Sequence, residues 1–271
     1  MRDKRRAVYV RLYVILAAAG VLVLLAAFGK YLAPFDPLEV DYTAVLAPPG
    51  RKHWCGTDRL GRDVFSRILC GAGSSFFLTF VMVFVVSFMG VAVGLMAGLL
   101  GGGADTVLMR FIDVLLAFPS SVFAIAVAGI MGAGIFHTVL ALSLVWWTKY
   151  ARLTRNMVLG IRQEDYIIQA RFGGAGDVGI LWRYILPNIL PQVVIMASLD
   201  VGGMMMALAG LSFLGLASQP PAPEWGYMLF ESRQYMQTAP WLMMAPGVAI
   251  LITVIVFNLL GDCVRDVLDP K

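Results

Sequence analysis

The chain has 271 residues, of which 59% are hydrophobic and only 14% are charged. Soluble globular domains carry about 25% charged residues, so this composition excludes a soluble domain and indicates that lipid surrounds much of the chain. The net charge of +4 does not indicate a nucleic-acid partner, because the cations flank apolar runs, where membrane topology explains them.

Apolar runs long enough to cross a bilayer, which takes about 20 residues, make up most of the chain. We predict six transmembrane helices, at residues 12–32, 76–100, 107–131, 135–158, 188–213 and 239–261. The first run follows a basic start, but it exceeds the roughly 7–15 residues of a signal-peptide core and no clean small-residue cleavage site follows it. The predicted fold class is therefore an all-α membrane protein that retains its first helix.

The distribution of cations predicts the side of each connection. Residues 1–11 carry five cations against one acid, so the positive-inside rule places this basic tail in the cytoplasm. Alternation then puts residues 33–75 and 214–238 outside, and it puts the loop at 149–186, with six cations against three acids, inside. An even number of spans returns the tail at 262–271 to the cytoplasm, which leaves residues 76–261 as a five-helix core.

The first outer segment contains the sequence HWCGTDRLGRDVFSRILCG at residues 53–71. Gly56 and Gly61, with the carboxylates of Asp58 and Asp63, predict tight turns held by side-chain to backbone hydrogen bonds.

Cysteine use carries little information. Three cysteines occur, without the repeated spacing of a disulfide framework or a zinc site. Cys55 and Cys70 share the first outer segment, so one disulfide is possible, and the sequence leaves their redox state open.

Two signals describe the second and third spans. Gly90, Gly94, Gly98 and Gly102 recur every four residues, which predicts a helix face that a neighbouring backbone approaches closely. Pro119 falls inside the third predicted span and should kink or break it.

A polar and charged loop at residues 162–187 separates the fourth and fifth spans. Two short helical halves flank a break at Gly173-Gly174-Ala175-Gly176, and the chain re-enters the membrane at Leu186-Pro187. A loop of this size on the positively charged side indicates a soluble partner.

The fifth span places Met196, Asp200 and Met204 at four-residue steps, hence on one helix face. A charge near the middle of the bilayer costs several kcal/mol unless it faces water, a partner or cargo. These three residues are therefore candidates for a translocation pathway, and Asp200 is a weak candidate metal ligand. The alternative for Asp200, a protonated and hydrogen-bonded packing role, stays open.

Three separated motifs resemble those of permease subunits of binding-protein-dependent ABC importers, in the branch that carries peptides, opines and nickel. Residues 53–71 resemble the stretch before the second span of that branch, and residues 212–233 resemble its segment between the fifth and sixth spans. The loop resembles the ATPase-docking motif, which reads E-A-A, three residues, Gly and a spacer ending in Leu-Pro. Ala170, Gly174 and Leu186-Pro187 are in register with it, whereas Ile168 and Gln169 replace the Glu and the first Ala.

The resemblance implies the fold of a type I ABC importer permease in the bacterial inner membrane, with both termini cytoplasmic. The implied partners are membrane lipid, a second homologous permease, an extracytoplasmic solute-binding protein and two cytoplasmic ATPase subunits, which would bind ATP and Mg, while this chain would hold no cofactor. The implied coupling residues are Gln169, Ala170, Gly174, Asp177, Leu186 and Pro187. The side that meets the binding protein would include Trp54, Asp58, Arg62, Asp63, Glu224 and Trp225, either in direct contact or as the wall of an outer vestibule.

Two other classes of protein are weighed against this one. The only Gly-Lys pair, Gly29-Lys30, lacks the rest of a phosphate-binding loop, so we predict no ATPase activity in this chain. An intramembrane protease would need Asp113 and Asp200 together, but Arg110 is placed to pair with Asp113 near the cytoplasmic end, and Asp200 lies near mid-bilayer. A passive scaffold in a membrane complex is the third class.

Cargo is less well determined. Residues 197–206 and 231–240 look more like nickel-type permeases than dipeptide permeases, which favours nickel or a chelated metal, with di- or oligopeptides as the alternative. Thioethers prefer soft ions and nickel is usually held by nitrogen and oxygen. A pathway for a chelated metal would therefore need room and polarity more than metal ligands.

Overall fold

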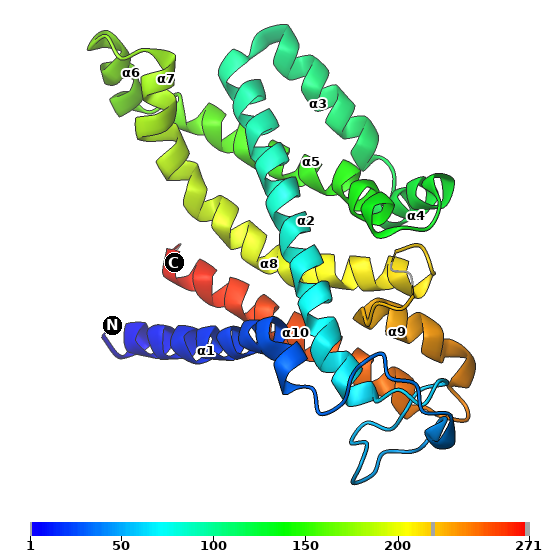
Figure 1. Ribbon diagram of the computed structural model, residues 1–271. Helices are drawn as coiled ribbons and strands as arrows, with labels where there is room; N and C mark the ends of the chain where they lie inside the picture. Colours follow the sequence, from blue (N-terminus) through cyan, green and yellow to red (C-terminus); the bar gives the residue numbers. More distant parts are fainter. Residues whose placement is uncertain (1, 218–219, 269–271) are drawn as a thin grey trace.

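The computed structural model describes residues 2–217 and 220–268, and within these ranges the chain is helical, with no β-strand (Figure 1). Its long helices are α1 (Arg2–Leu32), α2 (Val64–Leu100), α5 (Ile135–Ile161), α8 (Leu186–Phe213) and α10 (Trp241–Leu268). The shorter ones are α3 (Gly102–Leu116), α4 (Ser120–Met131), α6 (Asp165–Phe172), α7 (Asp177–Ile180) and α9 (Trp225–Ser232).

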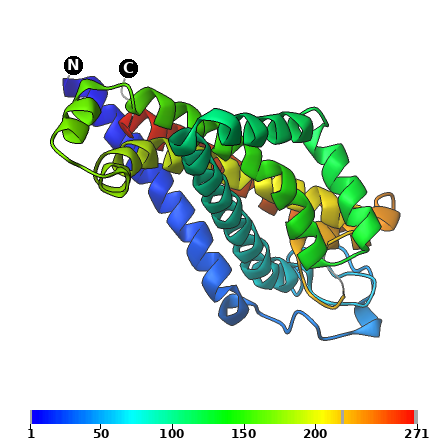
Figure 2. The same cartoon turned by 90° about the horizontal axis from the view of Figure 1, so that it is seen from above.

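Helix α2 holds the bundle together. It packs along α5 and also contacts α1 and α8, while α10 packs against α8 and α1. The described ends of the chain and the α6–α7 segment lie at one end of the molecule, and α9 and the segment before α2 lie at the other (Figures 1 and 2). This arrangement separates two ends that can meet different partners.

Four of the six predicted spans coincide with single stretches that meet a criterion of length and composition for crossing a membrane. Four stretches are long and apolar enough to cross a membrane, namely Val8–Leu32, Val64–Leu100, Asp177–Phe213 and Trp241–Leu268. Helices α3 and α4 meet this criterion only as a pair bent by 86°, which raises the number to five at most. Helix α5 does not qualify, because Lys149, Arg152 and Arg155 make its second half polar.

Several helices extend beyond the predicted spans. Helix α2 begins at Val64 instead of residue 76, because the side chain of Asp63 caps it by accepting from the Ser66 N–H. Helix α1 already begins at Arg2, so the predicted tail at 1–11 is helical over its described part. Helix α10 runs on to Leu268, and the last residues of the predicted tail, 269–271, lie outside the described ranges.

The third predicted span is broken at the proline. Helix α3 ends at Leu116 and α4 begins at Ser120, and the two helix axes are bent by 86°. Pro119 has no N–H to donate and its ring excludes the preceding turn, so the helix cannot continue through it. The sequence predicted a kink or a break, and the break is confirmed.

The predicted glycine face is confirmed at three of its four positions. A Cβ atom at Gly94 would lie 2.5 Å from the Ala151 carbonyl oxygen of α5, and one at Gly98 would lie 2.7 Å from Val158 Cβ. Gly90 approaches α5 in the same way. The prediction is wrong for Gly102, which follows the end of α2 with a φ of +58° and has no described atom within 4 Å of its Cβ position.

We predict that Gly94→Ala lowers the melting temperature of the protein in detergent. The new methyl group would force α2 away from α5, and overpacking of this kind costs about 1–3 kcal/mol. Gly20→Ala is the matched control, since no described atom lies within 4 Å of its Cβ position in α1. Equal melting temperatures for the two variants would contradict close packing of α2 on α5.

Candidate functional site

The segment between α5 and α8 is folded, with an apolar anchor and an apolar exposed surface. Ile167 of α6 and Ile180 of α7 are buried in a cluster with Val158, Ile185 and Ile189. On the outside of the segment Phe172 is 88% exposed, and Val178 and Trp182 are also largely exposed. Large exposed apolar side chains on a polar segment are typical of a surface that a partner covers.

Gly174 ends helix α6 in a left-handed conformation, with a φ of +85°. The Ala175 N–H donates to the Ala170 carbonyl at 3.0 Å, and the Gly174 N–H donates to the Arg171 carbonyl at 3.0 Å. These two bonds form a Schellman motif, in which glycine is favoured because side chains disfavour a positive φ. The sequence marked a break here, and the structure gives its geometry.

The second half of the loop is continuous with the fifth span. Helix α7, a π-helical turn at Leu181–Ile185 and α8 follow one another without interruption. Pro187 cannot donate to the fourth residue before it, and a wider π-turn directly precedes it. The loop is therefore attached rigidly to α8 and is not a flexible linker.

The predicted coupling residues occupy different positions in this segment. Gln169, Gly174 and Pro187 are exposed, whereas Ala170 and Leu186 are half-buried. Asp177 is exposed at the start of α7 and pairs with Arg171 at 3.3 Å.

Asp200 of α8 is paired in the structure. Its Oδ1 lies 2.5 Å from the Nζ of Lys149, and its Oδ2 accepts a hydrogen bond from the Tyr150 hydroxyl at 2.6 Å. The Lys149 ammonium also lies 4.1 Å from the ring centroid of Trp146. The sequence counted Lys149 among the loop cations, but the structure places it inside α5.

The other two candidate pathway residues share the helix of Asp200 but not its environment. Met204 is fully buried in the hydrophobic core, because α8 turns that side toward its neighbours, so it does not line a surface of this chain. Met196 is half-buried against the same core.

The predicted partner of Asp113 is wrong. Its Oδ1 lies 2.6 Å from Arg152 of α5 instead of pairing with Arg110 of its own helix. Because α3 packs against α5, a cation on the neighbouring helix is closer to this carboxylate than the cation one turn away. Asp113 and Asp200 thus each bind a different α5 cation.

The conspicuous residues before α2 build local structure. Asp63 accepts hydrogen bonds from the Ser66 N–H at 2.8 Å and from the Ser66 hydroxyl at 2.7 Å. His53 Nδ1 lies 2.9 Å from the other oxygen of Asp63. Gly61 turns the chain with a φ of +75°. The predicted side-chain to backbone turns are confirmed.

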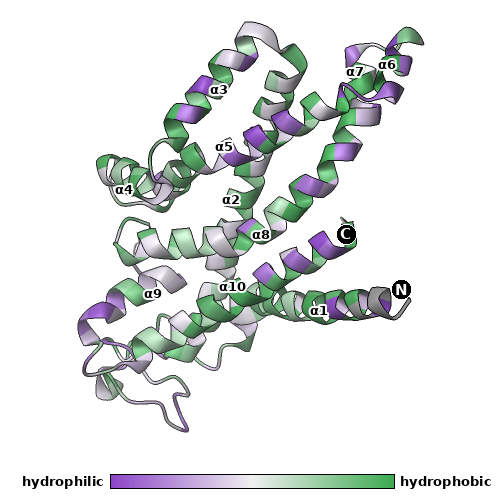
Figure 3. Cartoon of the chain, turned by 180° about the vertical axis from the view of Figure 1, so that it is seen from behind, coloured by the Kyte–Doolittle hydropathy of each residue, from purple (hydrophilic) through white to green (hydrophobic). Residues whose placement is uncertain are grey.

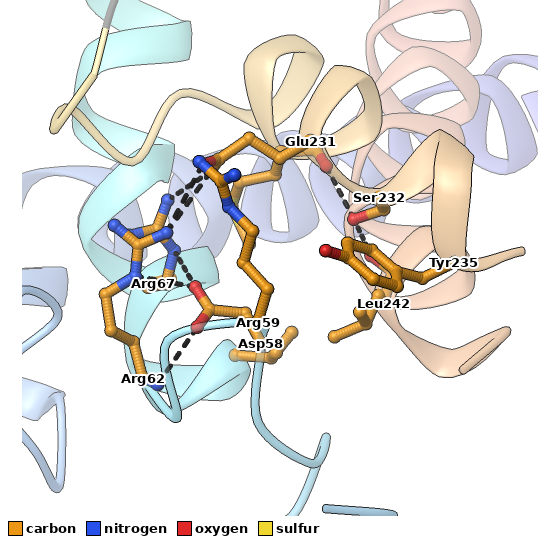
Figure 4. Close-up of a pocket in the computed structure, with 10 residues that line it drawn as sticks. Asp58, Arg59, Arg62, Arg67, Glu231, Ser232, Tyr235 and Leu242 are labelled. Atoms are coloured by element: carbon orange, nitrogen blue, oxygen red, sulfur yellow. Dashed lines mark hydrogen bonds and ion pairs between the residues drawn. The ribbon is translucent and has the colours of Figure 1, made fainter. Parts of the chain in front are cut away.

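A buried ion cluster, which we term the outer latch, joins this segment to α9 (Figure 4). It consists of Asp58, Arg59, Arg62, Arg67 and Glu231. Arg62 Nε lies 2.6 Å from Asp58 Oδ2, and Arg67 lies 3.1 Å from Glu231. Arg62 and Arg67 are almost completely buried, whereas the side chain of Arg59 is 43% exposed.

Glu224 and Trp225 also make buried hydrogen bonds at this end of the molecule. Glu224 is buried and caps α9 by accepting from the backbone N–H groups of Gly226 and Tyr227, both at 2.8 Å. The buried Trp225 donates its indole N–H to the Ile68 carbonyl at 2.9 Å. Asp63 and Arg62 are buried as well. Only Trp54, at 65% exposed, lies open among the six residues predicted for this side.

The sequence left open whether Cys55 and Cys70 form a disulfide. Cys55 and Cys70 are both free and do not form a disulfide. Burial raises the pKa of the Cys55 thiol, which disfavours its reactive thiolate form.

Sequence reasoning missed Lys149, Tyr150 and Trp146 as a group, and it missed Glu231 as the partner of Arg67. Arg67 carried a signal, since an arginine at the start of an apolar helix needs a counter-charge. Its partner lies 164 residues away in the sequence, and no local pattern could identify it.

We predict that Glu231→Gln strongly destabilises the contact between α9 and the segment before α2. Removing Glu231 leaves Asp58 to balance two buried arginines, Arg62 and Arg67, and breaking a buried ion pair by removing one partner costs about 3–5 kcal/mol. Arg59→Gln is the control, because Arg59 is more exposed and its contact with Glu231 is long, at 3.4 Å, so its loss costs about 1 kcal/mol or less. Thermal unfolding and limited proteolysis of the segment before α2 measure both effects, and a larger loss in Arg59→Gln contradicts the latch.

Comparisons with known proteins agree with this geometry. Residues 90–271 match the family model described as "Binding-protein-dependent transport system inner membrane component". The chain is 38% identical over 261 residues to the nickel transport system permease protein NikC of Escherichia coli (strain K12), covering 96% of this chain and 94% of that protein. It is 41% identical to the probable D,D-dipeptide transport system permease protein DdpC of the same strain, covering 93% and 84%.

Further similarity extends to another relative and to a solved structure. The glutathione transport system permease protein GsiD of Pectobacterium atrosepticum is 45% identical, covering 94% of this chain and 86% of that protein. The fold resembles a chain of the MetNI methionine ABC transporter in inward-facing conformations, with a TM-score of 0.54 at 21% identity, over 72% of this chain and 94% of that chain. The chain therefore belongs to the family of inner-membrane permease components of binding-protein-dependent ABC importers.

Proposed function

We propose that this chain is one of two homologous permease subunits that together form the translocation pathway. Membership of this family supports the proposal that the chain acts together with an ATPase and a binding protein. The full assembly would contain two cytoplasmic ATPase subunits, which hold ATP and Mg, an extracytoplasmic binding protein and a second permease. This chain would hold no cofactor of its own.

The proposed topology has six spans and cytoplasmic termini. Helix α5 has 27 residues, which at about 1.5 Å per residue is longer than the roughly 30 Å hydrocarbon core. Its cations would be tolerated because each faces an acid or a carbonyl group. The termini and the α6–α7 segment share one end of the molecule (Figure 2), and the excess of cations in residues 1–11 supports the cytoplasm for that end.

The α6–α7 segment is the proposed ATPase-coupling site, and its exposed apolar surface carries this proposal. Phe172, Val178 and Trp182 offer a partner a large apolar contact. The Schellman turn fixes α6 against α7, and α7 continues into α8. A movement of the ATPase would therefore reach the fifth span without being absorbed by a flexible joint.

The proposed cargo is nickel in a chelated form. The near full-length similarity to a nickel permease supports the metal, and Asp200 supports the chelate, because Lys149 and Tyr150 already occupy both of its oxygens. Peptides are the second candidate, which the similarity to dipeptide and glutathione permeases supports. Uptake of labelled nickel chelate against a labelled dipeptide, in vesicles that contain the complete importer, distinguishes the two.

We predict that Gly174→Val uncouples transport from ATP hydrolysis. A β-branched residue strongly disfavours a φ of +85°, so the turn after α6 would deform. Gly176→Val is the matched control, because Gly176 has a φ of −75° and no described atom within 4 Å of its Cβ position. Uptake and substrate-stimulated ATPase activity are measured together, and wild-type values for both in Gly174→Val contradict the proposed coupling role.

A second prediction concerns hydrolysis. The purified chain should hydrolyse no ATP, because its only Gly-Lys pair lacks the other residues of a phosphate-binding loop. Phosphate release should appear only after the ATPase partners are added. Activity that stays with this chain through a purification that removes all other proteins would overturn the assignment.

A further inference from the structure

Two cations of α5 are paired across the helix with acids of two different neighbours. Lys149 binds Asp200 of α8, and one turn later Arg152 binds Asp113 of α3. Seen from behind, hydrophilic positions lie on α5 in the stretch flanked by α3 and α8 (Figure 3). We term these four residues the charged strip.

The strip is not fully covered by the chain. The side chains of Arg152 and Asp113 are 45% and 52% exposed, and that of Lys149 is 33% exposed. Charges this exposed cannot face hydrocarbon without a cost of several kcal/mol, so this side must face water or another subunit. By contrast, α2 exposes Phe77, Phe84 and Phe88, which suit lipid.

The Lys149 pair lies deep in the bundle. Lys149 is 14 residues from the start of α5 at Ile135, and Asp200 is 14 residues from the start of α8 at Leu186. At about 1.5 Å per residue, both lie roughly 21 Å from those ends. The pair is thus near the middle of both helices.

Only one member of this pair can donate further hydrogen bonds, because an ionised carboxylate only accepts. Both oxygens of Asp200 are engaged, and the Tyr150 hydroxyl donates its proton to one of them. The Lys149 ammonium has three donors, and the structure commits one of them to Asp200. Its position over the Trp146 ring fixes its direction, while the one-third of the side chain that is exposed leaves it accessible.

We propose that Lys149 is a cargo-contact residue that binds a carboxylate of the passing cargo, and that Asp200 is its positioning residue. This inference rests on the proposed function and narrows the cargo. An ammonium repels a bare divalent cation, but it donates to the carboxylate of a peptide or of a metal chelate. Because Asp200 balances the charge of Lys149, the empty site carries no uncompensated charge, and the cargo carboxylate is held weakly enough to be released.

The test uses the complete importer in vesicles and a pair of labelled dipeptides that differ only in a free or an amidated C-terminus. A second pair compares nickel chelates with carboxylate ligands and with neutral ligands. For each pair, the ratio of uptake of the carboxylate form to the neutral form by wild type is divided by the ratio in which the separate binding protein binds them. The sequence of the binding protein is unchanged, so the quotient is the preference that the permease adds. Lys149→Met should reduce the remaining preference for the carboxylate form about tenfold, as expected for loss of one charged hydrogen bond. Lys149→Arg should preserve it.

Lys30→Met is the matched control, since Lys30 lies exposed in the last turn of α1. If Lys149→Met does not assemble, Lys149→Met/Asp200→Asn removes both charges together and replaces it. An unchanged preference in the variant that assembles, with normal uptake by wild type, overturns the proposal. Failure of wild type to transport any of these cargoes contradicts the proposed function instead. The pair of cargoes that loses its preference identifies peptide or chelate as the source of the carboxylate.

Discussion

The structure depends above all on how charged side chains of different helices are paired. Helix α5 carries Lys149, Arg152 and Arg155 where the other long helices are apolar, and each cation binds an acid of another helix. An isolated charge in hydrocarbon would cost several kcal/mol, so these pairs restrict where α3 and α8 can lie. The close approach of α2 at its glycine face then completes the position of α5.

The same constraint shapes the outer end. Arg62 and Arg67 are buried there because Asp58 and Glu231 come with them, from two segments far apart in the sequence. Asp63 and Glu224 cap the helices α2 and α9. In both segments, side chains replace water as the partners of buried backbone and charged groups.

At the opposite end, the α6–α7 segment keeps large apolar side chains exposed while the segment itself stays folded. The buried isoleucines under α6 and α7 hold the segment down, the left-handed Gly174 turns the chain after α6, and Phe172 remains exposed. Continuity from α7 into α8 joins this surface to the helix that bears Asp200. The proposed coupling site is therefore continuous with the helix of Asp200, which positions the proposed cargo contact Lys149 on the neighbouring helix α5.

The sequence by itself determined the membrane class, most of the helices, the break at Pro119, the close face at Gly90, Gly94 and Gly98, and the turn at Gly174, because each depends on local composition or on residues a few positions apart. It did not determine the partners of Asp200 and Arg67, which lie 51 and 164 residues away, nor the burial of Met204 and Glu224. Only the tertiary structure decided these points, because which charges and helix faces meet is set by packing between distant helices.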